Sequence, residues 1–509
     1  MPGTTADSST RTALEALQEE LGILTDLQQA ASLLSWDQHT YMPPGAASTR
    51  AQQLATLSKL THERLTGSGV KDPLEALRDA EFAPDSDEAA LLRLTRREVD
   101  RATKLPAGFV EEFARLRSSA QQTWAQARQD DDFGLFRPQL ERILDMTRQE
   151  ADYLGYQDHP YDALLDQYEP GMKTAKVKEV FAELRQATVA LVHDIVEGGA
   201  PVSDAPLHQF FDESVQEQFG IEVVSDYGYD FTRGRLDLTI HPFAEGIGKN
   251  DVRITTRYDQ HFLSTALFGT MHEAGHGMYE QGITDAYQRS PLGDAASLGM
   301  HESQSRMWEN LVGRSDAFWQ HGYPRLQELF PQLQDVSRRD FYAAVNRVEP
   351  SLIRVEADEV TYNLHIMVRF ELELAMLEGR LSPAELPDAW NTKYEEYLGI
   401  RPASDTQGCL QDIHWAMGAI GYFPTYALGN IMSVQLYQAA KRAHPQLEDD
   451  IRAGRFGTLL GWLRENVHRW GAKYQPEELL RRATGSELDA KPYIAYLNHK
   501  FRALYQVEP

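Results

Sequence analysis

Residues 262–277 read Phe-Leu-Ser-Thr-Ala-Leu-Phe-Gly-Thr-Met-His-Glu-Ala-Gly-His-Gly, and this stretch decides how the rest of the chain is interpreted. Its apolar residues, among them Leu263, Leu267 and Met271, recur at the spacing of one helix face. Gly275 and Gly277 interrupt that helix, although each costs about 1 kcal/mol there relative to alanine. The pattern predicts a helix that another backbone or a ligand approaches closely.

Two histidines lie four residues apart in this predicted helix. His272 and His276 therefore share one face, one turn apart, and can offer two imidazole nitrogens to one metal ion. Glu273 is poorly placed as a third ligand but well placed to take a proton from a metal-bound water. Zinc would lower the pKa of that water to about 7 and polarise a substrate carbonyl. The pattern predicts a metal-assisted hydrolase.

A catalytic zinc needs a third protein ligand and one open position. The segment 294–309 reads as a helix with Asp294 near its start, and its carboxylates Glu302 and Glu309 could reach back to the histidines. Glu302 is preferred because the chain between it and His276 is long enough for a loop and a returning helix. The neighbouring His301 could be the ligand instead, and the residues alone leave that choice open.

A second metal chemistry also fits part of the pattern. Glu273-Ala-Gly-His276 and Glu465-Asn-Val-His468 are two E-x-x-H pairs of the kind that di-iron helical bundles use. That interpretation needs two further glutamates that point into the bundle core as iron ligands, and it gives His272 no role. Iron rather than zinc in a metal analysis would favour it.

The surrounding sequence predicts a mostly α protein. Leucines recur at helical spacing through the N-terminal third, which indicates amphipathic helices packed on one another. Segments 234–240 and 251–258 alternate apolar and polar residues and predict an antiparallel hairpin with a wide loop between them. We expect one small antiparallel sheet, at about 220–260, directly before the metal helix.

Composition limits the class of protein. The chain has 509 residues and a net charge of −26, which disfavours nucleic acids and anionic membranes as partners. No apolar run approaches the roughly 20 residues of a membrane span. The segment 1–10 lacks the features of a secretory signal, so a cytoplasmic location is expected. The single cysteine, Cys409, excludes an internal disulfide and leaves His, Asp and Glu as the candidate metal ligands.

Further motifs in chain order connect this sequence with a known family. They are Ser35-Trp-Asp37, His241-Pro-Phe243, Asp251-Val-Arg-Ile-Thr255, His272-Glu-Ala-Gly-His276, His301-Glu-Ser-Gln-Ser-Arg306, Ile353-Arg-Val-Glu-Ala-Asp358, Gly408-Cys-Leu-Gln-Asp-Ile-His-Trp415 and Gly421-Tyr-Phe-Pro-Thr-Tyr426. Nearly end to end, the chain resembles the thermostable Taq-type metallocarboxypeptidases, relatives of angiotensin-converting enzyme and neurolysin.

The resemblance implies an architecture and an activity. The family has an elongated, two-lobed helical body with a deep active-site groove, commonly as a homodimer, and releases single C-terminal residues from peptides with a free C-terminus. It implies one catalytic domain, 1–509, with an N-terminal helical lobe (1–200) and a zinc-binding lobe (201–509). It also implies one Zn²⁺ per subunit, for which Co²⁺ could substitute, and Glu302 as the third ligand.

The resemblance also assigns substrate-binding residues. Arg354 is expected to grip the substrate carboxylate through two parallel bonds, although alone it would pass for a surface ion pair in an acidic helix, 354–359. His414 is expected to line the same subsite, although alone it would pass for a packed core histidine. The oxyanion donor is expected to be Tyr426, with Tyr422 as second choice.

Two residues on or beside the predicted sheet complete the expected site. Arg253 and His241 are placed at the cleft, where a peptide backbone could add as another strand. Without the resemblance, Arg253 would be a sheet-to-helix ion pair and His241 a turn histidine.

Overall fold

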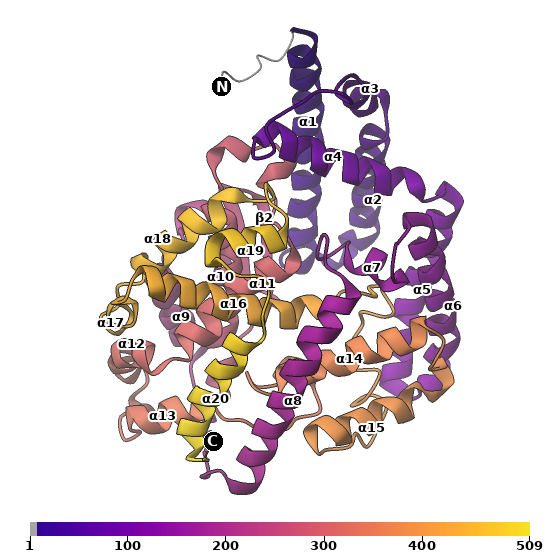
Figure 1. The fold of residues 1–509 in the computed structure, drawn as a ribbon. Coiled ribbons are helices and arrows are strands. Elements are labelled where there is room, and N and C mark those ends of the chain that lie inside the picture. The colour runs from indigo at the N-terminus through magenta and orange to yellow at the C-terminus, as the bar shows by residue number, and fades with distance from the viewer. Residues whose placement is uncertain (1–7, 509) are drawn as a thin grey trace.

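The computed structural model describes residues 8–508 and is built mainly of helices (Figure 1). Residues 1–7, on which part of the expectation about a secretory signal rests, lie outside the described residues. The N-terminal helices are α1 (Ser8–His39), α2 (Ala47–Leu65), α3 (Ser68–Ala76), α4 (Asp87–Lys104), α5 (Ala107–Asp130), α6 (Phe133–Leu154), α7 (Pro160–Leu165) and α8 (Thr174–Gly198). The prediction of a mostly α protein is confirmed. Within residues 8–508, no helix combines the length and apolar character needed to cross a bilayer.

The second part of the chain contains the sheet and the remaining helices. They are α9 (Glu213–Tyr227), β1 (Leu236–Leu238), β2 (Ala244–Gly248), β3 (Asp251–Thr256), α10 (Leu263–Gly282), α11 (Leu298–Arg306), α12 (Asp316–Leu329), α13 (Arg338–Val345), α14 (Tyr362–Leu377), α15 (Leu386–Leu398), α16 (Pro424–Ala443), α17 (Leu447–Arg452), α18 (Gly457–Asn466), α19 (Pro476–Thr484) and α20 (Lys491–Tyr505).

The small sheet differs from the predicted hairpin. Its strand order is β1-β3-β2, with β1 parallel and β2 antiparallel to β3. The prediction of an antiparallel pair was therefore wrong, because the connector 241–250 itself contains β2. Two glycines and a bulge between Gly246 and Gly248 give this strand little β propensity, so alternation could not reveal it. The sheet still directly precedes the metal helix, as predicted.

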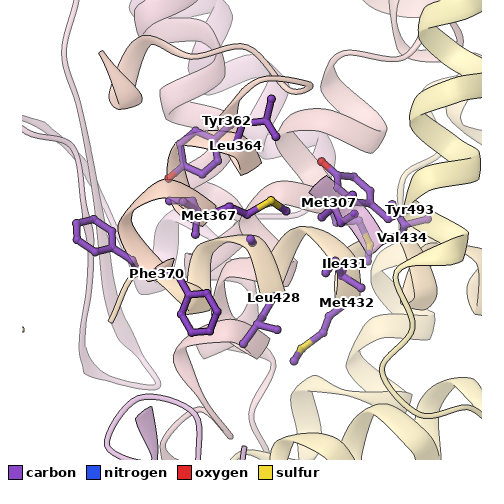
Figure 2. Packing of buried hydrophobic residues seen from close by; sticks show 14 of the residues in the cluster. Met307, Tyr362, Leu364, Met367, Phe370, Leu428, Ile431, Met432, Val434 and Tyr493 are labelled. Atoms are coloured by element: carbon purple, nitrogen blue, oxygen red, sulfur yellow. The ribbon is translucent and has the colours of Figure 1, made fainter. Parts of the chain in front are cut away.

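Two hydrophobic cores hold the helices. A small core joins α1, α3 and α4 to the segment around Ile283 and Tyr287. The larger one extends from Phe109 to Tyr505 and includes α10, α14 and α16. Figure 2 shows part of it, where Met367 and Phe370 of α14 lie among Leu428, Ile431 and Met432 of α16. These buried helices provide the rigid support for the functional side chains.

The helix after the metal helix begins later than predicted. Asp294 lies in a turn, and α11 begins at Leu298 because the Ser297 side chain accepts a hydrogen bond from the Met300 amide. The buried carboxylate of Glu169 accepts bonds from the Ser297 hydroxyl and the Gly299 amide, which adds a second cap. Beyond Arg306 the chain continues as a π-helix, η6 (Met307–Gly313).

Candidate metal centre and active site

Glycines allow α10 and α16 to pack closely against α11 at the metal centre. A Cβ atom built on Gly275 of α10 would lie 2.6 Å from the Cα atom of Ser305 on α11. A Cβ atom on Gly429 of α16 would lie 2.6 Å from the Cβ atom of Glu302. The predicted close approach at Gly275 is thus confirmed, and its partner is the backbone of α11. This packing holds Glu302 between α10 and α16.

Among the residues described, one group of His, Cys, Asp or Glu side chains could hold a metal ion, and it consists of His272, His276 and Glu302. The Glu302 Oε2 atom lies 3.6 Å from His272 Nε2 and 3.5 Å from His276 Nε2. Zinc bonds of roughly 2.0–2.1 Å in a tetrahedron place neighbouring ligand atoms about 3.3 Å apart. The donor set and its spacing therefore fit a tetrahedral ion with one position left for water.

The two alternative ligands of the sequence analysis lie behind the histidines. His272 donates from Nδ1 to Glu309 Oε2 over 2.9 Å. The Nδ1 atom of His276 faces that of His301, whose Nε2 atom lies 2.8 Å from Glu280 Oε1. Such partners fix the ring orientation and leave Nε2 of each histidine free to bind a metal.

Arg306 joins the two glutamates of this centre. Its Nε atom donates to Glu302 Oε1 over 2.7 Å, and its Nη1 atom donates to Glu309 Oε2 over 3.2 Å. Burial opposes ionisation of both carboxyls, but the Arg306 guanidinium outweighs it and holds the pKa of Glu302 well below its usual range. The same balance lowers the pKa of Glu309 to about 2. Glu302 is thus an anion whose Oε1 atom is bound to Arg306, while its Oε2 atom accepts a 3.1 Å bond from the Ser305 hydroxyl and faces the two histidines.

Glu273 lies in the same buried site. Its side chain is 6% exposed, and burial raises its pKa to about 7. The His272 ring opposes this rise, while Glu302 and Glu309 add to it. A carboxylate in such surroundings is more basic than one in water, as proton transfer at neutral pH requires.

Arg354 is buried, whereas its local sequence taken alone would indicate a surface ion pair in an acidic helix. Residues Arg354–Glu356 form a single 3-10 turn, η8, and the arginine is 6% exposed. Its Nε and Nη2 atoms donate to Asp412 Oδ1 over 3.1 and 2.8 Å, and Nη1 donates to the Tyr362 hydroxyl over 3.0 Å. These contacts use three of the five N–H groups of the guanidinium. One N–H group therefore remains on Nη1 and one on Nη2.

A cluster of aromatic residues surrounds Arg354. Its guanidinium carbon lies 5.1 Å from the centroid of the Tyr426 ring, and the Tyr426 hydroxyl lies 3.5 Å from His414 Nε2. The Tyr422 and Tyr426 rings are 5.4 Å apart. Burial lowers the pKa of His414 to about 4, so its ring is neutral at neutral pH. The structure therefore brings the predicted residues Arg354, His414, Tyr422 and Tyr426 together.

Both tyrosines keep their hydroxyl protons. Burial raises the pKa of Tyr426 far above its ordinary value and also raises that of Tyr422. The charge of Glu302 contributes to the rise at both residues, so both hydroxyls lie within electrostatic reach of the metal centre. Either hydroxyl can act as a hydrogen-bond donor.

Arg253 and His241 do not join this group. Arg253 donates two bonds of 2.8 Å to Asp251 on its own strand, and its guanidinium carbon lies 4.2 Å from the Trp36 ring centroid on α1. His241 is exposed in the bend between β1 and β2. Within residues 8–508, neither has a hydrogen bond or ring contact with the residues of the metal centre.

The second E-x-x-H pair belongs elsewhere. His468 is fully buried, and its Nε2 atom lies 2.9 Å from Gln304 Oε1. Glu465 accepts a bond of 2.6 Å from Arg469 at the surface. The di-iron interpretation is therefore wrong, because His468 and Glu465 lie outside the metal-binding group.

Several residues of the site were not predicted. Arg306 lies one helical turn after Glu302, a spacing that favours an ion pair, and Asp412 lies two residues before His414 in a quoted motif. Both signals were available in the sequence. Tyr362 and Arg369 carry no such signal, because only the folded chain places them beside Arg306, Arg354 and Asp412.

Comparisons with known proteins find similar sequences and structures along nearly the whole chain. The family model described as carboxypeptidase Taq (M32) metallopeptidase matches residues 16–501. Thermostable carboxypeptidase 1 of Thermus thermophilus is 44% identical over 499 residues, which cover 96% of this chain and 97% of that protein. Carboxypeptidase 1 of Bacillus subtilis is 39% identical over 483 residues, which cover 95% and 96%. The crystal structure of an M32 carboxypeptidase from Deinococcus radiodurans R1 has a TM-score of 0.95 at 45% identity, covering 97% of this chain and 100% of that one.

Proposed function

The chain belongs to the carboxypeptidase Taq (M32) metallopeptidase family and is a metallocarboxypeptidase that releases single C-terminal residues, and we propose that His272, His276 and Glu302 hold its metal as Zn²⁺. The observation that carries this proposal is that Glu302 Oε2 lies 3.6 and 3.5 Å from the two Nε2 atoms, in a group whose ligand atoms all lie within 4.8 Å of one another. When bound, zinc supplies a water of lowered pKa and polarises the scissile carbonyl. Co²⁺ accepts the same ligands and could substitute.

Glu273 is the general base of this proposal. It takes the proton of the attacking water and returns it to the leaving amine. Its burial beside His272 supports the role, because a desolvated carboxylate binds a proton more readily. The developing oxyanion receives a hydrogen bond from Tyr426 or, as second choice, Tyr422.

Arg354 binds the C-terminal carboxylate of the substrate in this proposal. The N–H groups left on its two terminal nitrogens suit the two oxygens of a carboxylate. His414, held neutral beside Tyr426, lines the same subsite as an uncharged hydrogen-bonding group. Release of a single residue requires that this anchor bind the carboxylate one residue's length, about 3.3–3.6 Å, beyond the peptide bond at the metal.

The sheet contributes the upstream side of the cleft. Because β2 is an edge strand in the order β1-β3-β2, a peptide backbone can pair with it as a further strand. We place His241 beside this edge and assign Arg253, fixed by Asp251 and Trp36, to the support of the neighbouring strand.

The remaining expectations are part of the same proposal. We propose one catalytic domain over 1–509, with lobes at 1–200 and 201–509 that enclose a deep groove, one zinc ion per subunit of a homodimer, and a cytoplasmic location. The net charge of −26 supports peptides rather than nucleic acids or anionic membranes as partners.

Metal analysis combined with one substrate series tests the proposal. The purified protein should contain about one zinc per chain, and a blocked dipeptide with a free carboxylate should be cleaved, whereas its C-terminal amide should not. Iron in place of zinc, or equal cleavage of the amide, would overturn the assigned site.

A further inference from the structure

We propose that Tyr362 is a positioning residue that fixes the interval between the carboxylate-binding arginine and the metal centre, and thereby restricts cleavage to the last peptide bond. The inference rests on the proposed role of Arg354. It concerns a side chain whose hydrogen bond and ring contacts, among residues 8–508, are with Arg306, Arg354 and Tyr426.

Tyr362 contacts both halves of the site at once. It is the first residue of α14 and is 5% exposed, at the edge of the hydrophobic cluster in Figure 2. The guanidinium carbon of Arg306 lies 4.3 Å from the centroid of its ring. Its hydroxyl accepts the 3.0 Å bond from Arg354 Nη1. A single rigid ring therefore separates the two arginines.

The contacts continue without a gap to the metal-binding carboxylate. Arg306 donates to Glu302 Oε1 over 2.7 Å, so the path Glu302, Arg306, Tyr362, Arg354 consists of direct contacts only. A tyrosine side chain has two rotatable χ angles, and here both its ring and its hydroxyl are engaged. Tyr362 therefore adds a segment of fixed length between the two flexible arginine side chains.

The far side of Arg354 is fixed as well. Asp412 accepts two of its N–H bonds on Oδ1, while the fully buried Arg369 donates to Asp412 Oδ2 over 2.6 Å. Arg369 in turn donates to the His365 carbonyl over 2.7 Å. Two guanidinium groups on one carboxylate leave a net charge of +1, so the cluster can be rigid and still attract an anion.

Release of a single residue depends on this interval. One extended residue spans about 3.3–3.6 Å, so an anchor that shifts by that length would place the preceding peptide bond at the metal. A misplacement of only about 1 Å can cost about 100-fold in rate. The separation between Arg354 and Glu302 must therefore be held more tightly than long arginine side chains could hold it alone.

Tyr362→Phe tests the inference, because it retains the ring on Arg306 and removes only the hydroxyl bond to Arg354. We expect kcat/KM for a blocked tetrapeptide with a free carboxylate to fall about 10-fold and dipeptide release to appear beside single residues. The zinc dissociation constant, measured by chelator competition, should stay unchanged. Tyr362→Leu, which also removes the ring from Arg306, should weaken zinc binding in addition.

Tyr493→Phe is the matched control. Tyr493 is a buried tyrosine of the same cluster, and its hydroxyl bonds with Asn363 rather than with Arg354. This variant should show the same loss of thermal stability as Tyr362→Phe but should leave kcat/KM and the product pattern as in the parent protein. Equal effects of the two variants on the products would overturn the inference.

Arg354→Ala separates this inference from the proposed function. If that variant retains the preference for free carboxylates over amides, the proposed role of Arg354 is wrong. If it loses the preference while Tyr362→Phe changes neither rate nor products, the anchor is right and the positioning role of Tyr362 is wrong. For the inference to stand, Tyr362→Phe must change both kcat/KM and the pattern of released products.

Discussion

His301 stands behind His276, with the two Nδ1 atoms 2.5 Å apart. The Nε2 atom of His301 lies 2.8 Å from Glu280 Oε1, so the His301 ring is held between Glu280 and His276. Because His301 occupies the Nδ1 side of the His276 ring, the Nε2 atom of His276 lies on the side of Glu302, 3.5 Å from Oε2. The residue that the sequence offered as an alternative ligand instead orients one of the ligands.

His301→Ala should weaken metal binding about 10- to 100-fold without changing the ligand set, because the His276 ring loses its orienting partner. Glu309→Gln should have a smaller effect, since an amide oxygen can still accept from His272. Chelator competition with the purified variants measures both. Unchanged zinc affinity in His301→Ala would contradict an orienting role.

Glu273→Gln should retain the metal and lose at least about 100-fold in kcat, because an amide cannot accept the proton of the attacking water. Metal content and turnover are measured on the same preparation. Retained turnover in metal-loaded protein would show that another group removes the proton.

Arg354→Ala should lower kcat/KM about 100-fold for substrates with a free carboxylate, in line with the loss of charge-assisted bonds. Arg354→Lys is the informative companion, because it keeps the charge but not the pair of parallel donors. Steady-state kinetics on the acid and on its amide decide the matter. A lysine variant that equals the parent protein would indicate that charge alone suffices.

Gly275→Ala should destabilise the protein by about 1–3 kcal/mol, because the new methyl group meets the α11 backbone 2.6 Å away. Gly461→Ala is the control, since it lies within α18 and its new methyl group would meet no atom within 4 Å. That variant should gain about 0.5–1 kcal/mol from helix propensity. Chemical denaturation compares the two, and equal effects would contradict the close packing at Gly275.

Acid should destabilise the protein partly through His468. Burial lowers its pKa to about 3, and Arg464 and His301 add to this shift, so the folded state keeps the ring neutral where the unfolded chain binds a proton. The unfolded state therefore binds more protons between about pH 6.5 and pH 3. In that window stability falls as pH falls, by up to about 1.4 kcal/mol per pH unit for this group. His468→Gln should reduce the slope in denaturation measured from pH 7 to pH 5, and an unchanged slope would exclude this contribution.

The sequence allowed the metal helix, its glycines and the helical class to be predicted, because each depends on local spacing. The parallel pairing of β1 was missed because β2 has almost no β propensity of its own. The burial of Arg354 did not follow from its local sequence for a different reason. Its partners Asp412 and Tyr362 are distant or inconspicuous in the chain, and local composition around 354–359 indicates a surface segment.

The Arg354, Asp412 and Arg369 cluster carries a net positive charge inside a protein whose overall charge is negative. The C-terminal carboxylate of a peptide is an anion, and it approaches a protein of net charge −26. At an ionic strength of about 0.1 M, charges more than about 10 Å apart are screened, whereas buried pairs are screened far less. Salt therefore reduces the repulsion during approach and leaves the attraction inside the site nearly intact. Ionic strength should influence how fast peptides enter this enzyme more than how well they are held once bound.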